Sequence, residues 1–359
     1  MRLGVAAAVV DGALVPGDLE VLDGRIAGVG LAGGGRGIAI PGLVDLQVNG
    51  FAGIDFATAD ADAYGLAGAA LLATGVTAFQ PTLITAPEAA LAAALAAVPK
   101  DAGPRVIGAH LEGPFLSPER LGAHDHAARR DPDAALLERL LRAGPVTQVT
   151  LAPELAGAFG LIDLLRRRGI VVACGHSDAT ADEAHHAFDL GATTVTHLFN
   201  AMRPLGHRDP GLAGTALARE DVSIQLIVDG NHLADETIRI VWAAAAGRMA
   251  LVSDATAATR GDGNGYELGA VGIEVRDGVP QRHDGTLAGG SATLLEAVRR
   301  LHALGVPLAD AVGAAATVPA RIAGRLDLGS LRPGAGADVV VLEDDLELRR
   351  TLVAGEDRL

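Results

Sequence analysis

Three residues that can bind a divalent metal ion stand at matching places in the sequence. Glu112, His176 and His197 each lie within two residues of the end of a short apolar segment. One carboxylate and two imidazoles form a ligand set that suits Zn²⁺ or Fe²⁺ and leaves a coordination position open for water. A single histidine at such a place is often structural, but three ligand types in the same relation to separate segments favour a metal site.

A second carboxylate, Asp254, directly follows another apolar segment, residues 249–253. Beside a metal-bound water, a carboxylate can take the proton as the water attacks a carbonyl. The alternative is that Asp254 caps the helix that follows. His124 lies in a loop rich in turn-forming residues and can donate a hydrogen bond to a developing oxyanion. Together these residues predict metal-assisted hydrolysis.

Two further segments could bind an anionic substrate. Arg208 lies in the loop at residues 204–211, and a guanidinium can bind phosphate through paired hydrogen bonds, although it could also be an ordinary loop arginine. Residues 287–291 precede a predicted helix, so their backbone N–H groups could face a ligand. The glycine pair in this second segment is weak evidence by itself.

The elements that must position these residues follow a regular alternation. Apolar strand-like segments alternate with helical or loop segments between residues 41 and 290, and they are residues 42–48, 76–79, 105–111, 148–151, 170–174, 193–196, 223–228 and 249–253. Eight parallel strands are the number that closes a (β/α)8 TIM-like barrel, whose active site lies at the carboxyl ends of its strands. The predicted helices are residues 86–97, 134–143, 179–190, 235–246, 292–304 and 308–322.

Both ends of the chain differ from this middle part. Residues 1–40 and residues 329–359 contain short strand-like segments separated by turns, without a helical period. Because a sheet needs several strands to be stable, the two ends are expected to pair in one small β-sandwich domain. The predicted α/β protein therefore has two domains, with residues 41–328 forming the hydrolase barrel.

Composition excludes several other classes of protein. The chain has 359 residues, 29 Lys and Arg against 44 Asp and Glu, and a net charge of −15, which disfavours nucleic-acid binding. Its single lysine, Lys100, lies in a predicted surface turn, so a Walker lysine, a Schiff base or a lysine-carbamate bridge is not expected. One cysteine, Cys174, excludes an internal disulfide. Without a predicted membrane span or signal peptide, we expect a cytoplasmic protein.

The assembled motifs resemble those of the N-acetylglucosamine-6-phosphate deacetylase family of the amidohydrolase superfamily. The matching blocks occur in the family's order along nearly the whole chain, and they are residues 41–45 with 49–50, 110–115, 122–124, 175–177, 196–202, 208–211, 229–232, 254–256 and 287–289. The long blocks 110–115 and 196–202 are the most specific of them.

The resemblance implies a role for each of these residues. It implies one divalent ion per subunit, Zn²⁺ with Fe²⁺ as the alternative, on Glu112, His176 and His197, with Asp254 as base and then acid. It places His124 on the amide carbonyl, and Arg208 and His232 on the 6-phosphate. The remaining substrate-binding residues that it implies are Ala123, Asn200, Ala201, Leu287, Ala288 and Gly289. It also implies a homodimer, in which part of the phosphate site can come from the neighbouring subunit.

The first strand departs from the pattern of the wider superfamily, in which this strand usually carries His-x-His and binds a second metal. This sequence has Gln47 and Asn49 there, and neutral amides are poor zinc ligands beside imidazole, so a mononuclear site is predicted. Three alternative functions remain: a deacetylase for the galactosamine epimer, an amidohydrolase for N-acyl amino acids or cyclic amides, and a sugar-phosphate-binding protein without catalysis. The pairing of a metal site with a base disfavours the last.

Overall fold

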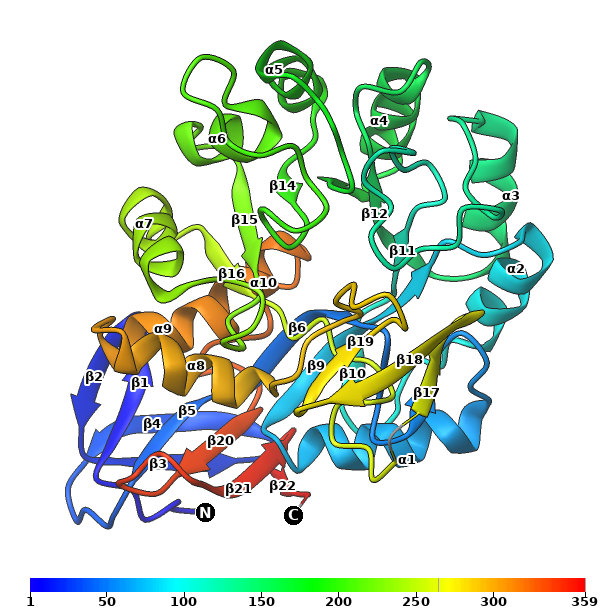
Figure 1. Ribbon diagram of the computed structural model, residues 1–359. Helices are drawn as coiled ribbons and strands as arrows, with labels where there is room; N and C mark the ends of the chain where they lie inside the picture. The colour runs from blue at the N-terminus through cyan, green and yellow to red at the C-terminus, as the bar shows by residue number, and fades with distance from the viewer. Residues whose placement is uncertain (264, 359) are drawn as a thin grey trace.

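The computed structural model describes residues 1–263 and 265–358, and its central feature is a barrel of parallel strands (Figure 1). The strands follow one another around the barrel in the order β6 (Leu43–Val48), β9 (Val76–Ile84), β11 (Ala109–Glu112), β12 (Val146–Leu151), β13 (Val171–Cys174), β14 (Thr194–Val195), β15 (Ser223–Leu226) and β16 (Met249–Leu251). A short strand, β10 (Arg105–Val106), pairs with an earlier part of β9 than β11 does. The predicted barrel is confirmed, and seven of the predicted strands each correspond to one barrel strand. The predicted strand at residues 105–111 is instead divided into β10 and β11.

The barrel closes at the carboxyl ends of its first and last strands. β6 and β16 share no regular ladder, but Val48 and Ala255 form a parallel bridge, and the Asn49 N–H donates to the Ala255 carbonyl at 2.7 Å. The buried Asp45 carboxylate accepts from the Ser253 N–H across the same seam at 3.2 Å. The closing contacts therefore adjoin Asp254 and fix its backbone.

Helices surround the barrel in the connections between its strands (Figure 1). The predicted ones are observed as α2 (Glu88–Ala97), α3 (Ala134–Ala143), α5 (Ala181–Leu190), α7 (Asp235–Ala245) and α8 (Leu294–Ala303). Three more were not predicted: α1 (Ala61–Leu72), α4 (Ala158–Arg167) and α6 (Gly211–Ala218). All three contain internal glycines, which weaken the helical signal in the sequence.

The predicted helix at residues 308–322 is two helices, which corrects that prediction. α9 (Leu308–Ala315) and α10 (Thr317–Ile322) meet at Ala316, whose φ and ψ are −133° and −67°. The cause is Pro319, because proline has no N–H for the carbonyl four residues earlier and its ring clashes with that carbonyl. The chain turns at this point before it leaves the barrel.

Strands from both chain ends build the small β unit, with the two termini close together at the bottom of Figure 1. One sheet has the order β2 (Ala13–Pro16), β1 (Ala7–Val10), β5 (Ile38–Pro41), β20 (Val339–Leu342), β21 (Leu348–Val353) and β22 (Glu356–Asp357). The hairpin of β3 (Asp18–Leu22) and β4 (Arg25–Leu31) encloses a separate apolar core with it. We propose residues 1–40 and 329–359 as the bounds of this domain and 41–328 as those of the barrel.

Two small sheets cover the mouth of the barrel, and neither was predicted. β7 (Gly50–Phe51) pairs with β8 (Ile54–Asp55), and an antiparallel sheet joins β17 (Gly265–Leu268), β18 (Val271–Arg276) and β19 (Val279–Gln281). We call this second sheet, together with the loop to residue 290, the flap. Leu268 and Ile273 of the flap pack against Ile84 at the end of β9.

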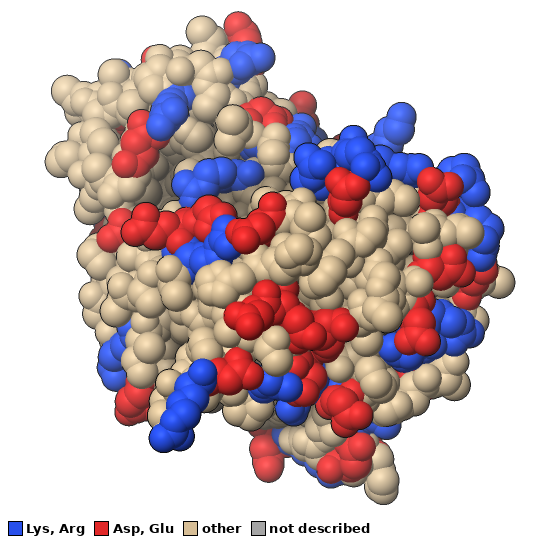
Figure 2. All heavy atoms as spheres, turned by 90° about the horizontal axis from the view of Figure 1, so that it is seen from above, with Lys and Arg blue, Asp and Glu red and all other residues tan. Residues whose placement is uncertain are grey.

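Figure 2 shows acidic and basic side chains interspersed over the face seen from above, without one continuous basic surface. Within residues 1–263 and 265–358, every helix is too short or too polar to cross a membrane.

Candidate metal centre and active site

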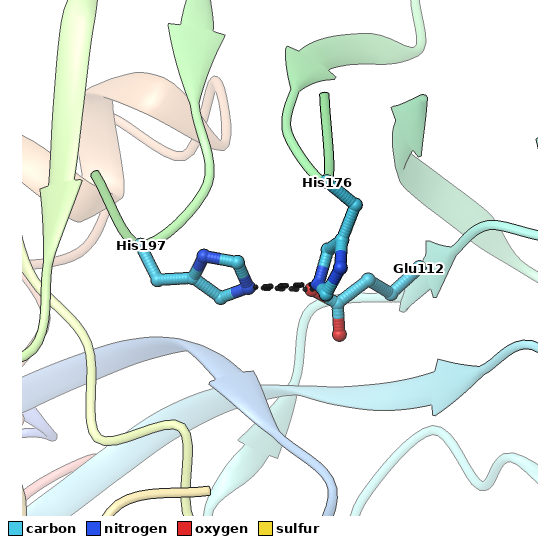
Figure 3. A group of neighbouring side chains, drawn as sticks. All are labelled: Glu112, His176 and His197. Carbon is cyan, nitrogen blue, oxygen red and sulfur yellow. Dashed lines mark hydrogen bonds and ion pairs between the residues drawn. The ribbon is translucent and has the colours of Figure 1, made fainter. Parts of the chain in front are cut away.

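Glu112, His176 and His197 converge at the carboxyl ends of three barrel strands (Figure 3). Glu112 is the last residue of β11, and the histidines follow β13 and β14. Glu112 Oε1 lies 3.2 Å from His176 Nε2 and 3.0 Å from His197 Nε2, and the two Nε2 atoms are 3.1 Å apart. All three side chains are buried. The loops that carry both histidines turn sharply, with φ of 49° at His176 and 27° at His197.

The donor atoms of this cluster fit a metal ion. His176 Nδ1 donates to the Arg120 carbonyl at 2.9 Å, and this bond leaves the lone pair of a neutral ring on Nε2. That lone pair faces a carboxylate oxygen and a second imidazole nitrogen at about hydrogen-bond distance. Such an arrangement is repulsive unless a positive charge lies between the atoms, so a divalent cation satisfies it.

The cluster also has the charge that a cation requires. Burial by itself would raise the pKa of the Glu112 carboxyl, but the neighbouring imidazoles of His124, His176 and His197 outweigh it and hold that pKa well below its usual value. Gln47 donates its Nε2 to the same Glu112 oxygen at 3.2 Å. Gln47, on the first barrel strand, therefore donates a hydrogen bond to the proposed metal ligand Glu112.

Asp254 lies at the same mouth, directly after Ser253, and its φ is 48°. Asn49 donates from Nδ2 to Asp254 Oδ1 at 2.9 Å, which leaves Oδ2 available. Burial raises the pKa of this carboxyl to about 6, and the negative charge of Glu112 adds to the rise. A carboxyl group with this pKa can both accept and return a proton near neutral pH.

His124 is held in one tautomer by the segment that follows β9. The Thr85 N–H donates to His124 Nδ1 at 3.3 Å, and the Thr85 hydroxyl lies 2.9 Å from the same atom. Nδ1 is therefore an acceptor, and the proton of the neutral ring is on Nε2, 3.7 Å from Glu112 Oε2. Burial lowers the pKa of His124 to about 4, and nearby His176 adds to this effect. His124 is thus a neutral donor directed at the metal centre.

These groups line one cavity of about 280 Å³ beneath the flap. It also contains most of the predicted substrate-binding residues, which are Ala123, Asn200, Ala201, His232, Leu287 and Gly289. His232 Nδ1 contacts Asp229 Oδ2 at 2.9 Å, and this carboxylate fixes the orientation of the ring. Ala288 is buried behind the wall, where its N–H donates to the Pro280 carbonyl.

Arg208, like Ala288, is a predicted site residue that does not line this cavity. Its side chain is exposed in the loop between β14 and α6, and it makes no hydrogen bond or ion pair with the described residues. Its neighbour Asp209 is anchored, because Arg203 Nη1 donates to Asp209 Oδ2 at 2.7 Å. The role of Arg208 stays a prediction.

The sequence analysis missed several residues of the cavity. Ile84, Leu268 and Thr286 line it, and Thr85 orients His124 from behind. Ile84 and Thr85 follow the predicted strand at residues 76–79, which continues to Ile84. A predicted strand that ended at residue 84 instead of residue 79 would have placed Ile84 and Thr85 at the mouth of the barrel. The flap residues carry no such signal.

Comparison with known proteins agrees with this arrangement. Residues 38–357 match the model of the Amidohydrolase family. The chain is 40% identical over 344 residues to the N-acetylglucosamine-6-phosphate deacetylase of Homo sapiens, a match that covers 90% of this chain and 83% of that protein. It is 33% identical over 326 residues to the N-acetylgalactosamine-6-phosphate deacetylase of Escherichia coli O157:H7, covering 88% and 86% of the two chains.

The fold is also similar to that of a solved structure with substrate bound. This is a mutant of N-acetyl-D-glucosamine-6-phosphate deacetylase from Mycobacterium smegmatis in complex with N-acetyl-D-glucosamine-6-phosphate. The TM-score is 0.96 at 37% identity, with 100% of this chain and 99% of the other covered. The chain therefore belongs to the Amidohydrolase family and, within it, to the N-acetylglucosamine-6-phosphate deacetylases.

Proposed function

We propose that this protein hydrolyses N-acetyl-D-glucosamine 6-phosphate to D-glucosamine 6-phosphate and acetate. The observation that carries the proposal is one cavity that holds the buried Glu112, His176 and His197 cluster, the Asp254 carboxyl and the Nε2 donor of His124. These are the groups that amide hydrolysis requires: ligands, a base and an oxyanion donor. The test is acetate release from a panel of N-acetylhexosamines with and without a 6-phosphate.

Glu112, His176 and His197 would hold one divalent ion per subunit, which we propose to be Zn²⁺, with Fe²⁺ as the alternative. When bound, such an ion polarises a carbonyl and lowers the pKa of a bound water from about 15.7 toward about 7. Hydrogen bonds from neighbouring groups hold the ligands in place, since the Arg120 carbonyl accepts from His176 and Gln47 donates to Glu112.

Asp254 moves the proton that the reaction requires. As the water oxygen bonds to the carbonyl carbon, Asp254 Oδ2 accepts the water proton while Asn49 holds Oδ1. Asp254 then returns this proton to the amide nitrogen, and the C–N bond breaks to release a neutral amine and acetic acid, which loses its proton to solvent and becomes acetate. Without this protonation, the amine would be too basic to leave.

His124 stabilises the oxyanion with its Nε2–H. We expect His124→Gln to lower kcat by about 10²-fold with little change in KM, because the donor acts mainly on charge that develops in the transition state. Steady-state acetate release measures both constants. A substitution on the exposed side of the same loop, His126→Gln, is the control. If the two variants turn over alike, His124 is not the oxyanion donor.

The sugar is proposed to lie against Ala123, Asn200, Ala201 and the backbone at Leu287, Ala288 and Gly289, with its phosphate on His232 and Arg208. Since Arg208 is exposed outside the cavity of its own chain, we propose a homodimer in which it reaches the partner's phosphate site. Arg208→Ala is expected to raise KM for the phosphorylated substrate about tenfold or more, with kcat nearly unchanged. Unphosphorylated N-acetylglucosamine is the control substrate, and its kcat/KM should not change.

Subunit mixing tests the homodimer separately. In a heterodimer of the Arg208→Ala and Asp254→Asn chains, the subunit with intact Asp254 receives Arg208 from its partner. Activity at low substrate concentration should therefore exceed that of either variant alone. Additive activity in the mixture would place Arg208 in its own subunit's site or outside the phosphate site.

The pH dependence follows from Asp254. Burial and Glu112 raise its pKa to about 6, and only the ionised form accepts a proton. The value of kcat/KM should therefore increase as pH rises through this pKa and fall below it. A cation on the neighbouring ligands favours the ionised form, which moves this acid limb lower. A profile measured with acetate release should show the limb at or below about pH 6; a limb centred above about pH 7 would belong to another group.

The galactosamine epimer is a second candidate substrate, because the Escherichia coli relative is an N-acetylgalactosamine-6-phosphate deacetylase at 33% identity. The panel separates the epimers directly by their kcat/KM values. An N-acyl amino acid in the panel tests the amidohydrolase alternative, in which Arg208 would bind a carboxylate.

A further inference from the structure

One wall of the catalytic cavity has no role in the chemistry proposed so far. The lining residues that are not metal ligand, base, oxyanion donor or sugar contact are Asn49, Ile84, Gly122, Leu268 and Thr286. Asn49 is engaged with Asp254, which leaves Ile84 and Leu268 as the two large apolar side chains of this group. Both are 5% exposed and belong to one apolar cluster.

Ile84 of this wall lies across the barrel from one part of the proposed sugar site. Ile84 ends β9, the second strand around the barrel, whereas Asn200 and Ala201 follow β14, the sixth. Strands two and six of an eight-stranded barrel lie across from each other. A substrate whose sugar contacts the residues after β14 and β15 therefore extends its acyl group toward the end of β9.

The geometry around His124 leads to the same placement. The Thr85 N–H contacts His124 Nδ1, so the imidazole packs against the peptide that joins Ile84 to Thr85. The carbonyl carbon of a bound amide has three substituents. Its oxygen faces His124 Nε2 and the metal ligands, its nitrogen faces Asp254 and the sugar, and its acyl carbon is left to face Ile84 and Leu268.

We infer that Ile84 and Leu268 form an acyl-binding wall that restricts the enzyme to short N-acyl groups, above all acetyl. This inference rests on the proposed deacetylase function and specifies its substrate class. The wall is fixed from both sides, since Ile84 belongs to the barrel and the flap is tethered beside Leu268. There the Gly269 N–H donates to Asp55 Oδ2 at 2.7 Å, and a Cβ on Gly269 would lie 3.6 Å from the Ile84 side chain.

The test compares N-acetyl, N-propionyl and N-butyryl glucosamine 6-phosphate as substrates. Wild-type kcat/KM should fall by about tenfold or more from acetyl to butyryl, because each added methylene must displace packed side chains. Ile84→Ala and Leu268→Ala should each raise the butyryl-to-acetyl ratio of kcat/KM by about tenfold. Ile84→Val, a smaller change that better preserves folding, should raise the propionyl-to-acetyl ratio.

Ile273→Ala is the matched control, because Ile273 is buried in the same cluster but does not line the cavity. The butyryl-to-acetyl ratio of kcat/KM for this variant should stay within about twofold of the wild-type ratio. The wall is overturned if wild type hydrolyses the butyryl compound as well as the acetyl one, or if the cavity variants keep the ratio of the control. Wild type that releases no acid from any of the three compounds overturns the proposed function itself.

Discussion

Replacing Asp254 with asparagine should lower kcat for N-acetylglucosamine 6-phosphate by about 10³- to 10⁴-fold while the protein still binds its metal. The amide keeps the shape of the side chain and its Oδ1, which accepts from Asn49 at 2.9 Å. It cannot accept the proton of the attacking water or return one to the leaving nitrogen. Both halves of the reaction therefore lose their proton carrier, whereas Glu112, His176 and His197 are unchanged.

The measurement pairs acetate release with metal analysis of the same sample. Asp310→Asn, an exposed carboxylate in the first turn of α9, is a control that should keep wild-type kcat. If Asp254→Asn bound metal and retained more than about a tenth of wild-type kcat, Asp254 could not be the base. If it lost its metal, the low activity would report on the metal site instead.

Removal of the metal should abolish activity to a similar extent. A chelator should reduce acetate release to below about 1% of the untreated enzyme, and Zn²⁺ or Fe²⁺ should restore it. Glu112→Gln and His176→Ala should fail to recover on metal addition. The first replaces an anionic carboxylate ligand with a neutral amide, and the second removes an imidazole nitrogen from a cluster whose ligand atoms all lie within 4.8 Å of one another. Metal content measured after dialysis gives a readout independent of turnover.

The same experiment tests the number of ions. Gln47→Ala removes the hydrogen bond to Glu112 Oε1 but no ligand of the proposed single ion, so it should still bind one equivalent. Wild type that holds two equivalents, with one lost in Gln47→Ala, would contradict the mononuclear prediction. A chain that stays fully active after exhaustive removal of metal would contradict the metal-dependent mechanism as a whole.

The barrel could be predicted because its strands are nearly continuous apolar segments with polar residues at their ends. β6, for example, is buried throughout, and β11 ends in the Glu112 ligand. Parallel strands that are buried on both faces leave this signal, and the fold places their carboxyl ends together. The flap strands leave no such signal, since they are short, partly exposed and separated by glycine turns.

The sequence by itself determined the ligand types, the candidate base and the alternation that brings them to one mouth, because these depend on residue chemistry and local periodicity. The tertiary structure alone decided which tautomer His124 adopts, that Leu268 packs in one cluster with Ile84, and that Arg208 is exposed outside the cavity of its own chain. Each of these depends on contacts between residues distant in the chain. Such contacts arise only when the barrel closes and the flap packs over it, so no local pattern in the sequence records them.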